Sequence, residues 1–299
     1  MAQTSVPDRL VVIDNASSAD QGDLISAVSP LVEFVRLGTN VGFAAANNLG
    51  IEMLRDCEFV ALVNPDAFPE STWLDRLLAA AEAHPDFASF ASTIERADGS
   101  GRLESAGDAY HVYGTAWPSR GGGPASATLP RQEVFGASAA AALYRREWLE
   151  RVGGFDGRFF CYFEDVDLNL RLQVAGGRCL YVPEARVRHV GGASSDSGRE
   201  FAIYHSQRNV VWTFVKSAPP HVFWRYLPMH LLLNVGSVVT YAARGHTRTL
   251  LRAKRDALLG LPAMLKSRRT IMRARAFDRA TFDANLRAGV RVLLRETRP

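Results

Sequence analysis

The sequence has 299 residues, of which 47% are hydrophobic and 22% are charged, a composition typical of an ordinary globular protein with a substantial buried core. It contains no low-complexity tract. The three cysteines, Cys57, Cys161 and Cys179, are odd in number and lack metal-type spacing, so we expect packed thiols in a reducing compartment. The opening residues MAQTSVPDRL have no basic start and no apolar core, so no secretory signal is expected.

The charge is divided unevenly along the chain, although the net charge is only +4. Residues 244–299 hold 15 Lys and Arg against 4 Asp and Glu, a net charge of +11, which leaves −7 for the first 243 residues. This asymmetry indicates different partners for the two parts. A solvated helical face, an anionic lipid surface or a nucleic acid would each explain the basic part. Because few aromatic residues interleave with its arginines, we expect no nucleic acid and favour a membrane surface.

Strand patterns alternate with helical patterns over the first 100 residues. Short apolar runs with polar ends predict strands at residues 9–15, 32–38, 57–66 and 87–96. Helical periodicity predicts helices at residues 43–56 and 71–85, the second capped by Ser71 or Thr72. This alternation predicts an α/β fold, with a mainly parallel sheet and helices on both faces.

The character of the chain changes twice beyond residue 97. Residues 98–130 are rich in Gly, Pro and Ser, which predicts a mobile surface loop. Order resumes at residues 133–156, and residues 178–192 have the pattern of a strand, a turn and a short strand. After about residue 200 the chain becomes helical, apolar and increasingly basic. We therefore expect an α/β domain at 1–200 and a helical, basic region at 201–299.

Polar residues follow three of the predicted strands at their carboxyl ends, where open α/β sheets bind ligands. Asp14 and Asn15 follow the first strand, Asn64 and Asp66 follow the third, and His189 closes the last. A backbone turn or a helix cap would explain any one of these groups. Three groups at one edge of the same sheet favour a binding site.

Residues 40–48, NVGFAAANN, place a glycine-containing turn before a predicted helix. Helix N-termini attract phosphate because their free N–H groups point outward. The motif is neither a dinucleotide fingerprint nor a P-loop, so it is weak evidence by itself. Asn47 and Asn48 interrupt an otherwise apolar helix, where asparagine needs a hydrogen-bond partner.

Residues 159–177, FFCYFEDVDLNLRLQVAGG, crowd three carboxylates against aromatic side chains. Leucines spaced at helical intervals predict a helix that ends at the glycine pair 176–177. One acid at its start would be explained by the helix dipole, but three exceed what capping requires. Desolvation beside aromatic groups raises the pKa of a carboxyl, which suits a general base. A catalytic role for this cluster is therefore expected.

Five motifs in this order resemble the family 2 glycosyltransferases: VVIDNASS, NVGFAAANN, LVNPD, GGFDGRFFCYFEDVDLNLRL and RHVGGASS. The resemblance is greatest to the bacterial rhamnosyltransferase-like branch that builds cell-wall and surface polysaccharides, and it covers about residues 8–195. It implies a Rossmann-like GT-A fold and transfer of a sugar, with inversion, from a nucleotide diphosphate to a hydroxyl group. The favoured donor is dTDP-rhamnose, with UDP-linked sugars as the alternative. The implied acceptor is lipid-linked or a polysaccharide.

The resemblance also assigns roles to individual residues. It implies that the nucleotide sugar is bound by Asp14, Asn15, Asn40, Gly42, Asn47, Asn64 and Asp66. It implies that Asp165 is the catalytic base and that Glu164 orients the acceptor, which leaves Asp167 as the helix cap. Asp66 and His189 would lie near a Mg²⁺ or Mn²⁺ ion, because hard oxygen ligands suit both ions and the ion neutralises the leaving diphosphate.

Two departures from the family pattern bear on function. Asn64 stands where the metal motif has its first acid, which predicts weaker metal binding. The first strand and helix of the family have no counterpart before residues 9–15, so a central strand and part of the base pocket are expected to be missing. A non-catalytic remnant that binds a membrane or a partner is therefore the alternative from another class. No Gly-x-Gly-x-x-Gly follows a strand, which argues against a nucleotide-dependent oxidoreductase.

Residues 222–243 form an apolar stretch close to membrane-spanning length. Arg225, Pro228, His230 and Asn234 argue against a span, so we expect a helix that packs on the α/β domain or lies in the membrane interface. With the basic residues that follow, this segment predicts a cytoplasmic protein held peripherally at the inner face of the plasma membrane. The sequence leaves a homo-oligomer open.

Overall fold

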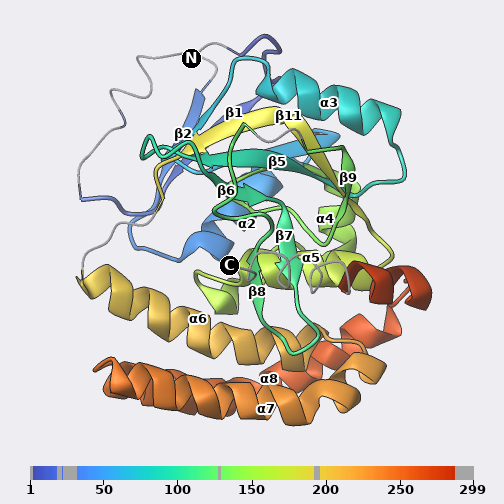
Figure 1. The fold of residues 1–299 in the computed structure, drawn as a ribbon. Coiled ribbons are helices and arrows are strands. Elements are labelled where there is room, and N and C mark those ends of the chain that lie inside the picture. Colours follow the sequence, from blue (N-terminus) through green and yellow to red (C-terminus); the bar gives the residue numbers. More distant parts are fainter. Residues whose placement is uncertain (1–2, 19–21, 23–31, 127–128, 192–195, 287–299) are drawn as a thin grey trace.

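The computed structural model describes residues 3–18, 22, 32–126, 129–191 and 196–286 (Figure 1). Its strands are β1 (Leu10–Asp14), β2 (Val32–Arg36), β3 (Phe59–Val63), β4 (Ala67–Pro69), β5 (Ser89–Arg96), β6 (Leu103–Ala106), β7 (Asp108–Tyr110), β8 (Ala116–Pro118), β9 (Gln132–Val134), β10 (Ala141–Arg145) and β11 (Cys179–His189). Its helices are α2 (Phe43–Met53), α3 (Trp73–Ala83), α4 (Arg146–Val152), the 3₁₀ turn η1 (Gly157–Phe159), α5 (Glu164–Val174), α6 (Asp196–Ser217), α7 (Pro220–Ala243) and α8 (Thr247–Arg273).

The larger sheet has the strand order β3–β10–β5–β11–β4, with β6 paired to β5 and β9 paired to β11. β5 and β11 run parallel, as do β1 and β2, whereas the other described pairings are antiparallel. The α/β class is confirmed, but the expectation of a mainly parallel sheet is wrong. β10 enters antiparallel between β3 and β5 because the chain reaches it through the long segment 97–140 and not through a crossover helix.

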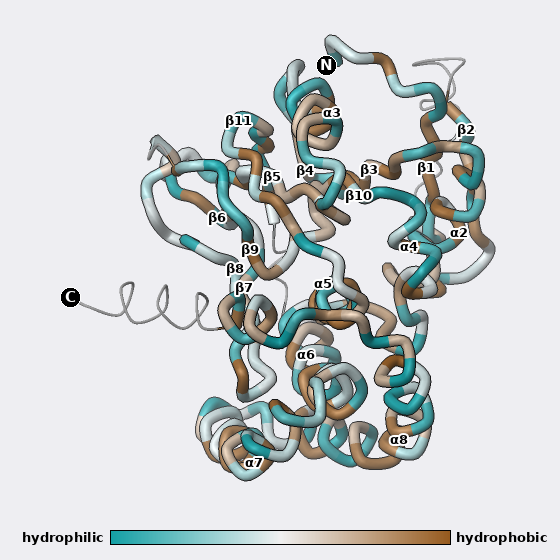
Figure 2. The backbone as a smooth tube through the Cα atoms, turned by 90° about the vertical axis from the view of Figure 1, so that its right-hand side faces the viewer, coloured by the Kyte–Doolittle hydropathy of each residue, from teal (hydrophilic) through white to brown (hydrophobic). Residues whose placement is uncertain are grey.

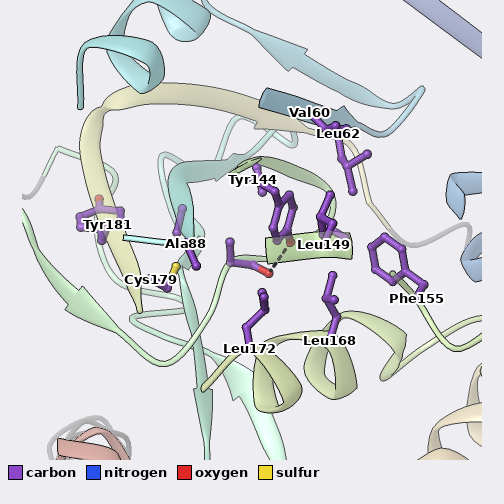
Figure 3. Close-up of a cluster of buried hydrophobic side chains, with 14 of the residues drawn as sticks. Val60, Leu62, Ala88, Tyr144, Leu149, Phe155, Leu168, Leu172, Cys179 and Tyr181 are labelled. Carbon is purple, nitrogen blue, oxygen red and sulfur yellow. Dashed lines mark hydrogen bonds between the residues drawn. The ribbon is translucent and has the colours of Figure 1, made fainter. Parts of the chain in front are cut away.

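Helices cover both faces of the larger sheet, as the alternating pattern predicts (Figure 1). On one face α3 inserts Leu77 into a core with Phe90 of β5. On the other face α4 and α5 bring Leu149 and Leu168 against Tyr144 of β10 (Figure 3). Successive side chains of a strand point to opposite faces, which is why β5, in the middle of this sandwich, is buried from Ser89 to Ile94.

The pair β1–β2 is separate from the larger sheet. Among the described strands none joins β1 to β3, so each of the two has a free edge. In Figure 2 β1 lies between β2 and β3. The residue after β1 nevertheless meets the turn before α2, because Asn15 hydrogen-bonds to Asn40 and to the N–H of Val41.

The segment 98–130 is not the loop that its composition predicts. It contains β6, β7 and β8, and its residues Leu103, Ala106 and Tyr110 are buried. Glycines supply backbone angles that other residues disfavour at the turns between these short strands. The expected strand, turn and short strand at 178–192 are also one strand, β11, with a register shift between Val182 and Arg186.

The helical part lies against the α/β layers on the side of α5 (Figures 1 and 2). α6 contributes Phe214 to a core with Tyr110 and Leu170, and Trp212 to a second core with Phe159. α8 packs on α6, and α7 lies beside α8. No described helix is long and apolar enough to cross a bilayer, which agrees with the expectation for residues 222–243. The domain boundary near residue 200 stays a prediction.

Candidate active site

Two asparagines connect the carboxyl end of β1 with the start of α2. Asn15 Nδ2 donates to Asn40 Oδ1 at 3.0 Å, and Asn15 Oδ1 accepts from the N–H of Val41 at 2.9 Å. Asn40 Oδ1 also accepts from the N–H of Gly42 at 2.9 Å. The structure thus brings Asn15 together with Asn40 and Gly42, two other predicted nucleotide-site residues that lie about 25 positions later in the chain.

Asp14 lies at the same strand end. Its Oδ1 accepts from the N–H of Ser17 at 2.8 Å, and Arg36 Nε lies 3.4 Å from its Oδ2. The hydrogen bonds from Ser17, and then the charge of Arg36, hold the pKa of the Asp14 carboxyl below its usual value. The carboxylate is therefore ionised at neutral pH and can accept hydrogen bonds from hydroxyl or amide groups.

Gly42 lies where the turn before α2 packs against the loop that precedes α5. Its φ of +85° lies in the left-handed region, and the N–H of Ala44 donates to Phe160 O at 3.2 Å. A Cβ on Gly42 would lie 2.6 Å from Phe160 Cδ2 and 2.7 Å from Phe160 O. Only glycine allows this backbone approach, because any side chain would displace the aromatic loop.

Replacing Gly42 with Ala is expected to lower kcat/KM, because a left-handed Ala costs about 1–3 kcal/mol and its Cβ overlaps Phe160. Steady-state kinetics would measure the effect. Gly50→Ala is the matched control: it lies in the same helix, and its Cβ would meet only Ile13 at 3.9 Å. Equal kinetic constants for the two variants would contradict the role given to Gly42.

The two asparagines inside α2 have structural partners. Asn48 donates to Phe155 O and accepts from Phe155 N–H, both at 2.8 Å, so it fixes the loop before η1. Asn47 Nδ2 donates to Phe43 O, one turn back in its own helix, at 2.9 Å. Asn48 thereby has the hydrogen-bond partner that an asparagine in an apolar helix needs. The nucleotide-binding role of Asn47 stays a prediction.

His189 lies between two carboxylates at the end of β11. Its Nε2 is 3.1 Å from Asp66 Oδ1, and its Nδ1 is 2.9 Å from Glu104 Oε2. The hydrogen bond to Glu104 and the charges of both acids raise the pKa of the imidazole, whose protonated form donates to both acids. Asn64 stands at the turn between β3 and β4, where its C=O accepts from the N–H of Ala67 at 3.0 Å. The predicted pair Asp66 and His189 is thus brought together, and β6 adds Glu104.

A second acidic cluster forms at the start of α5. Burial first, and then the charge of Asp165, raise the pKa of the Glu164 carboxyl well above its usual value, and Glu164 Oε2 has no hydrogen-bond partner among the described residues. Burial also raises the pKa of Asp165, although its Oδ1 accepts from the N–H of Val166 at 2.8 Å. The two adjacent acids predicted as catalytic therefore lie in a desolvated position.

Asp108 of β7 is a third acid of this cluster, and sequence reasoning missed it. It is buried, and no described residue donates a hydrogen bond to its carboxyl group. Burial, and then the charges of Asp165 and Glu104, raise its pKa well above the usual value. Asp108 therefore lies within electrostatic reach of Asp165 and Glu104, and its raised pKa favours the neutral form of its carboxyl group.

Asp167 is not the helix cap that was expected. Its side chain is completely buried, and α5 has no side-chain cap at its N-terminus. Asp167 Oδ2 accepts from Arg171 Nε at 2.8 Å and from Lys216 Nζ at 2.7 Å, and its Oδ1 accepts from Ser217 Oγ at 2.9 Å. Asp167 is therefore the centre of an ion-pair network that fastens α6 to α5.

The aromatic loop between η1 and α5 has a strained backbone. Phe160, Tyr162 and Phe163 have φ values of 68°, 63° and 67°, which aromatic residues rarely adopt. Asn209 of α6 holds the loop, because its Nδ2 donates to the carbonyls of Phe159, Cys161 and Tyr162.

Arg208 supports the same loop through its own bond to the Phe159 carbonyl at 2.8 Å. Sequence reasoning missed both α6 residues. The signal for Asn209 was a polar residue directly before the mostly apolar run VVWTF.

The residues around Asp66 fit a divalent cation whose coordination shell is completed by oxygen atoms of the substrate. The Asp66 side chain is 44% exposed and lies beside His189 Nε2, so a carboxylate oxygen and, once its proton is displaced, an imidazole nitrogen can both face an ion. Within the described ranges no group of three or more His, Cys, Asp and Glu side chains has the geometry to hold a metal unaided. Two protein ligands suit an ion whose remaining ligands are diphosphate oxygens and water.

Comparison with known proteins defines the class to which this fold and site belong. Residues 1–153 match the family described as Glycosyl transferase family 2, and residues 126–251 match Glycosyl transferase family group 2. Over 287 residues the chain is 31% identical to the N-acetylglucosaminyl-diphospho-decaprenol L-rhamnosyltransferase of Mycobacterium tuberculosis, covering 86% of this chain and 89% of that relative. The rhamnosyltransferase WbbL of Escherichia coli is 36% identical over 67 residues, which cover 20% of this chain and 25% of that one.

The chain therefore belongs to glycosyl transferase family 2. It is a glycosyltransferase that moves a sugar from a nucleotide donor. Staphylococcus aureus TarS 1-349, solved in complex with UDP, aligns with a TM-score of 0.51 at 15% identity over 99% of this chain and 85% of that one. GalNAc-T7, solved with UDP, GalNAc and Mn²⁺, aligns with a TM-score of 0.53 at 15% identity over 70% of this chain and 42% of that one. These likenesses confirm the GT-A fold.

Proposed function

We propose that the protein is an inverting rhamnosyltransferase that transfers rhamnose from dTDP-rhamnose to a hydroxyl group of a lipid-linked acceptor in cell-wall or surface glycan synthesis. The observation that carries this proposal is the match to the mycobacterial L-rhamnosyltransferase over almost the full length of both chains. The name of that relative also supplies the acceptor class, a sugar on a polyprenyl diphosphate.

The base of this reaction is Asp165. Its carboxylate takes the proton of the acceptor hydroxyl while the acceptor oxygen bonds to the anomeric carbon and the bond from that carbon to the diphosphate oxygen breaks. Attack from the side opposite the leaving group inverts the anomeric centre. The burial that raises the pKa of Asp165 makes it a stronger base than an exposed carboxylate. Burial also raises the pKa of Glu164, which favours the protonated form, and that form can donate a hydrogen bond that orients the acceptor.

The nucleotide side of the site consists of Asp14, Asn15 and Asn40, which would bind the base and ribose. Asp66 and His189 would hold a Mg²⁺ or Mn²⁺ ion. The bound ion supplies neutralisation of the charge that develops on the leaving diphosphate. Asn64 stands where the metal motif of the family has its first acid, so we expect weak metal binding. After removal of the metal with EDTA, millimolar Mg²⁺ or Mn²⁺ should therefore be needed to restore activity.

A donor panel tests the proposal. Purified protein is incubated with N-acetylglucosaminyl-diphospho-polyprenol and dTDP-rhamnose, UDP-N-acetylglucosamine, UDP-galactose or GDP-mannose, each with Mg²⁺, Mn²⁺ or EDTA. Transfer with dTDP-rhamnose, and little with the other donors, is expected. Transfer from a UDP-sugar and not from dTDP-rhamnose would support the alternative donor class. That alternative is kept because TarS was solved in complex with UDP. Donor binding in a thermal-shift assay without any transfer would count against this acceptor.

A further inference from the structure

α7 exposes a continuous apolar stripe on the side that faces away from the rest of the molecule. Its members are 56–71% exposed and are Trp224, Leu231, Leu232, Val235 and Val239. These five positions recur at helical spacing on one face, whereas Val222 and His230 are buried on the other. Single exposed apolar side chains are ordinary on soluble proteins, but a contiguous stripe marks an interaction surface.

α8 continues this surface with leucines and basic residues together. Leu251, Leu258 and Leu259 are exposed, while the opposite side of the helix buries Ala253, Ala257 and Met264. The two helices lie side by side at the end of the molecule opposite α3 (Figures 1 and 2). Lys254 Nζ of α8 connects them by donating to Asn234 Oδ1 of α7 at 2.5 Å. We call the exposed sides of α7 and α8 the α7–α8 face.

The charge on this face has one sign. α7 contains Arg225 and no acidic residue, and α8 contains eight Lys and Arg against one acid, Asp256. That acid is already engaged by Tyr204 at 2.7 Å and by Arg255. Among the exposed residues of α8 are Arg248, Lys266 and Arg269. Leucines interleaved with unneutralised basic groups match an anionic lipid surface, where apolar side chains enter the acyl boundary and arginines meet phosphate.

We infer that the α7–α8 face docks the protein onto anionic lipid bilayers, with both helices lying in the plane of the interface. A second copy of the chain fits the face less well, because two surfaces of the same positive charge repel each other. The inference rests on the surface itself and not on the sugar or acceptor that the enzyme uses.

Vesicle co-sedimentation tests the inference with the full chain and no substrate. The wild-type protein is expected to pellet with vesicles of phosphatidylcholine and 30% phosphatidylglycerol at low salt, and to remain largely in solution with pure phosphatidylcholine. Trp224→Ser/Leu232→Ser should lower the partition coefficient about tenfold or more, because two large apolar anchors are lost. Arg248→Gln/Arg269→Gln should lower it by about fivefold per residue on anionic vesicles.

Arg55→Gln/Arg76→Gln removes the same charge from exposed positions of the α/β part and is the matched control. It should bind as the wild type does. Failure of the wild type to bind anionic vesicles, or equal binding by the control and the α7–α8 variants, would overturn the inference. So would a wild-type dimer in light scattering that Trp224→Ser/Leu232→Ser converts to a monomer. Donor hydrolysis in detergent should be unchanged in all variants, which separates this result from any failure of the proposed reaction.

Discussion

Asp165→Asn is expected to lower kcat by about 10²–10⁴-fold while the protein still folds and binds the nucleotide sugar. The amide cannot take the proton of the acceptor hydroxyl, and a positioned general base contributes a factor of this size. The change is nearly isosteric, and the N–H of Val166 can still donate to the remaining oxygen. Single-turnover kinetics would measure the loss, and thermal shift with the donor would verify binding. Wild-type turnover would refute the assignment of the base.

Asp108→Asn is the informative partner of this variant. Burial and the charge of Asp165 raise the pKa of Asp108 and favour its neutral form, so a neutral amide at this position should reduce kcat far less than Asp165→Asn. If Asp108→Asn were the more damaging change, Asp108 and not Asp165 would be the base.

The pH dependence of the rate should report the same cluster. Because burial raises the pKa of Asp165, the base is protonated, and activity is lost, at a higher pH than the ordinary carboxyl value of 3.8. The acidic limb of a kcat/KM profile should therefore lie above pH 3.8 and should disappear from the residual activity of Asp165→Asn. A wild-type rate that stays constant down to pH 3.8 would contradict the desolvated environment.

Asp167→Ala is expected to reduce the free energy of unfolding by about 3–5 kcal/mol. Removing one member of a buried ion-pair network leaves the others without compensation, here Arg171 and Lys216, whose side chains are only 5% and 3% exposed. Urea denaturation followed by circular dichroism would measure the change. Glu150→Gln, which removes an exposed pair with Arg146, is the control and should cost about 0.5 kcal/mol or less. Similar values for the two variants would show that Asp167 does not fasten α6 to α5.

Acid should weaken the same network. Burial raises the pKa of Asp167, but the charges of Lys216 and Arg171 outweigh it and hold the pKa below the ordinary value of 3.8. A carboxyl whose pKa is lowered on folding contributes stability above its unfolded pKa, and this is lost as the pH falls through its folded pKa. The wild-type advantage over Asp167→Ala should therefore shrink as the pH falls below 3.8.

The local patterns of the sequence determined most of the elements and the family. Strands such as β1, β3 and β5 and helices such as α2 and α3 were predictable, because periodicity and the residues at their ends are local properties. The proximity of Asp66 and His189 was also predictable, because both stand in motifs that the resemblance covers. The role of Asp165 as the base stays a prediction. The segment 98–130 was mispredicted, because its Gly, Pro and Ser content conceals short strands whose pairing partners are distant in the chain.

Only the tertiary structure decided what the charged and polar groups do. The three acids of FEDVD look alike in the sequence, yet Asp167 meets Lys216 from α6, whereas Asp165 lies near Asp108 from β7. Asn209 could not be identified as the residue that holds the aromatic loop, because its three carbonyl partners lie about 50 positions away. Ionisation and hydrogen bonding depend on burial and on neighbours in space. The sequence by itself thus determined most of the elements and the enzyme family, and folding decided which acid is buried near Asp108 and which one joins two helices.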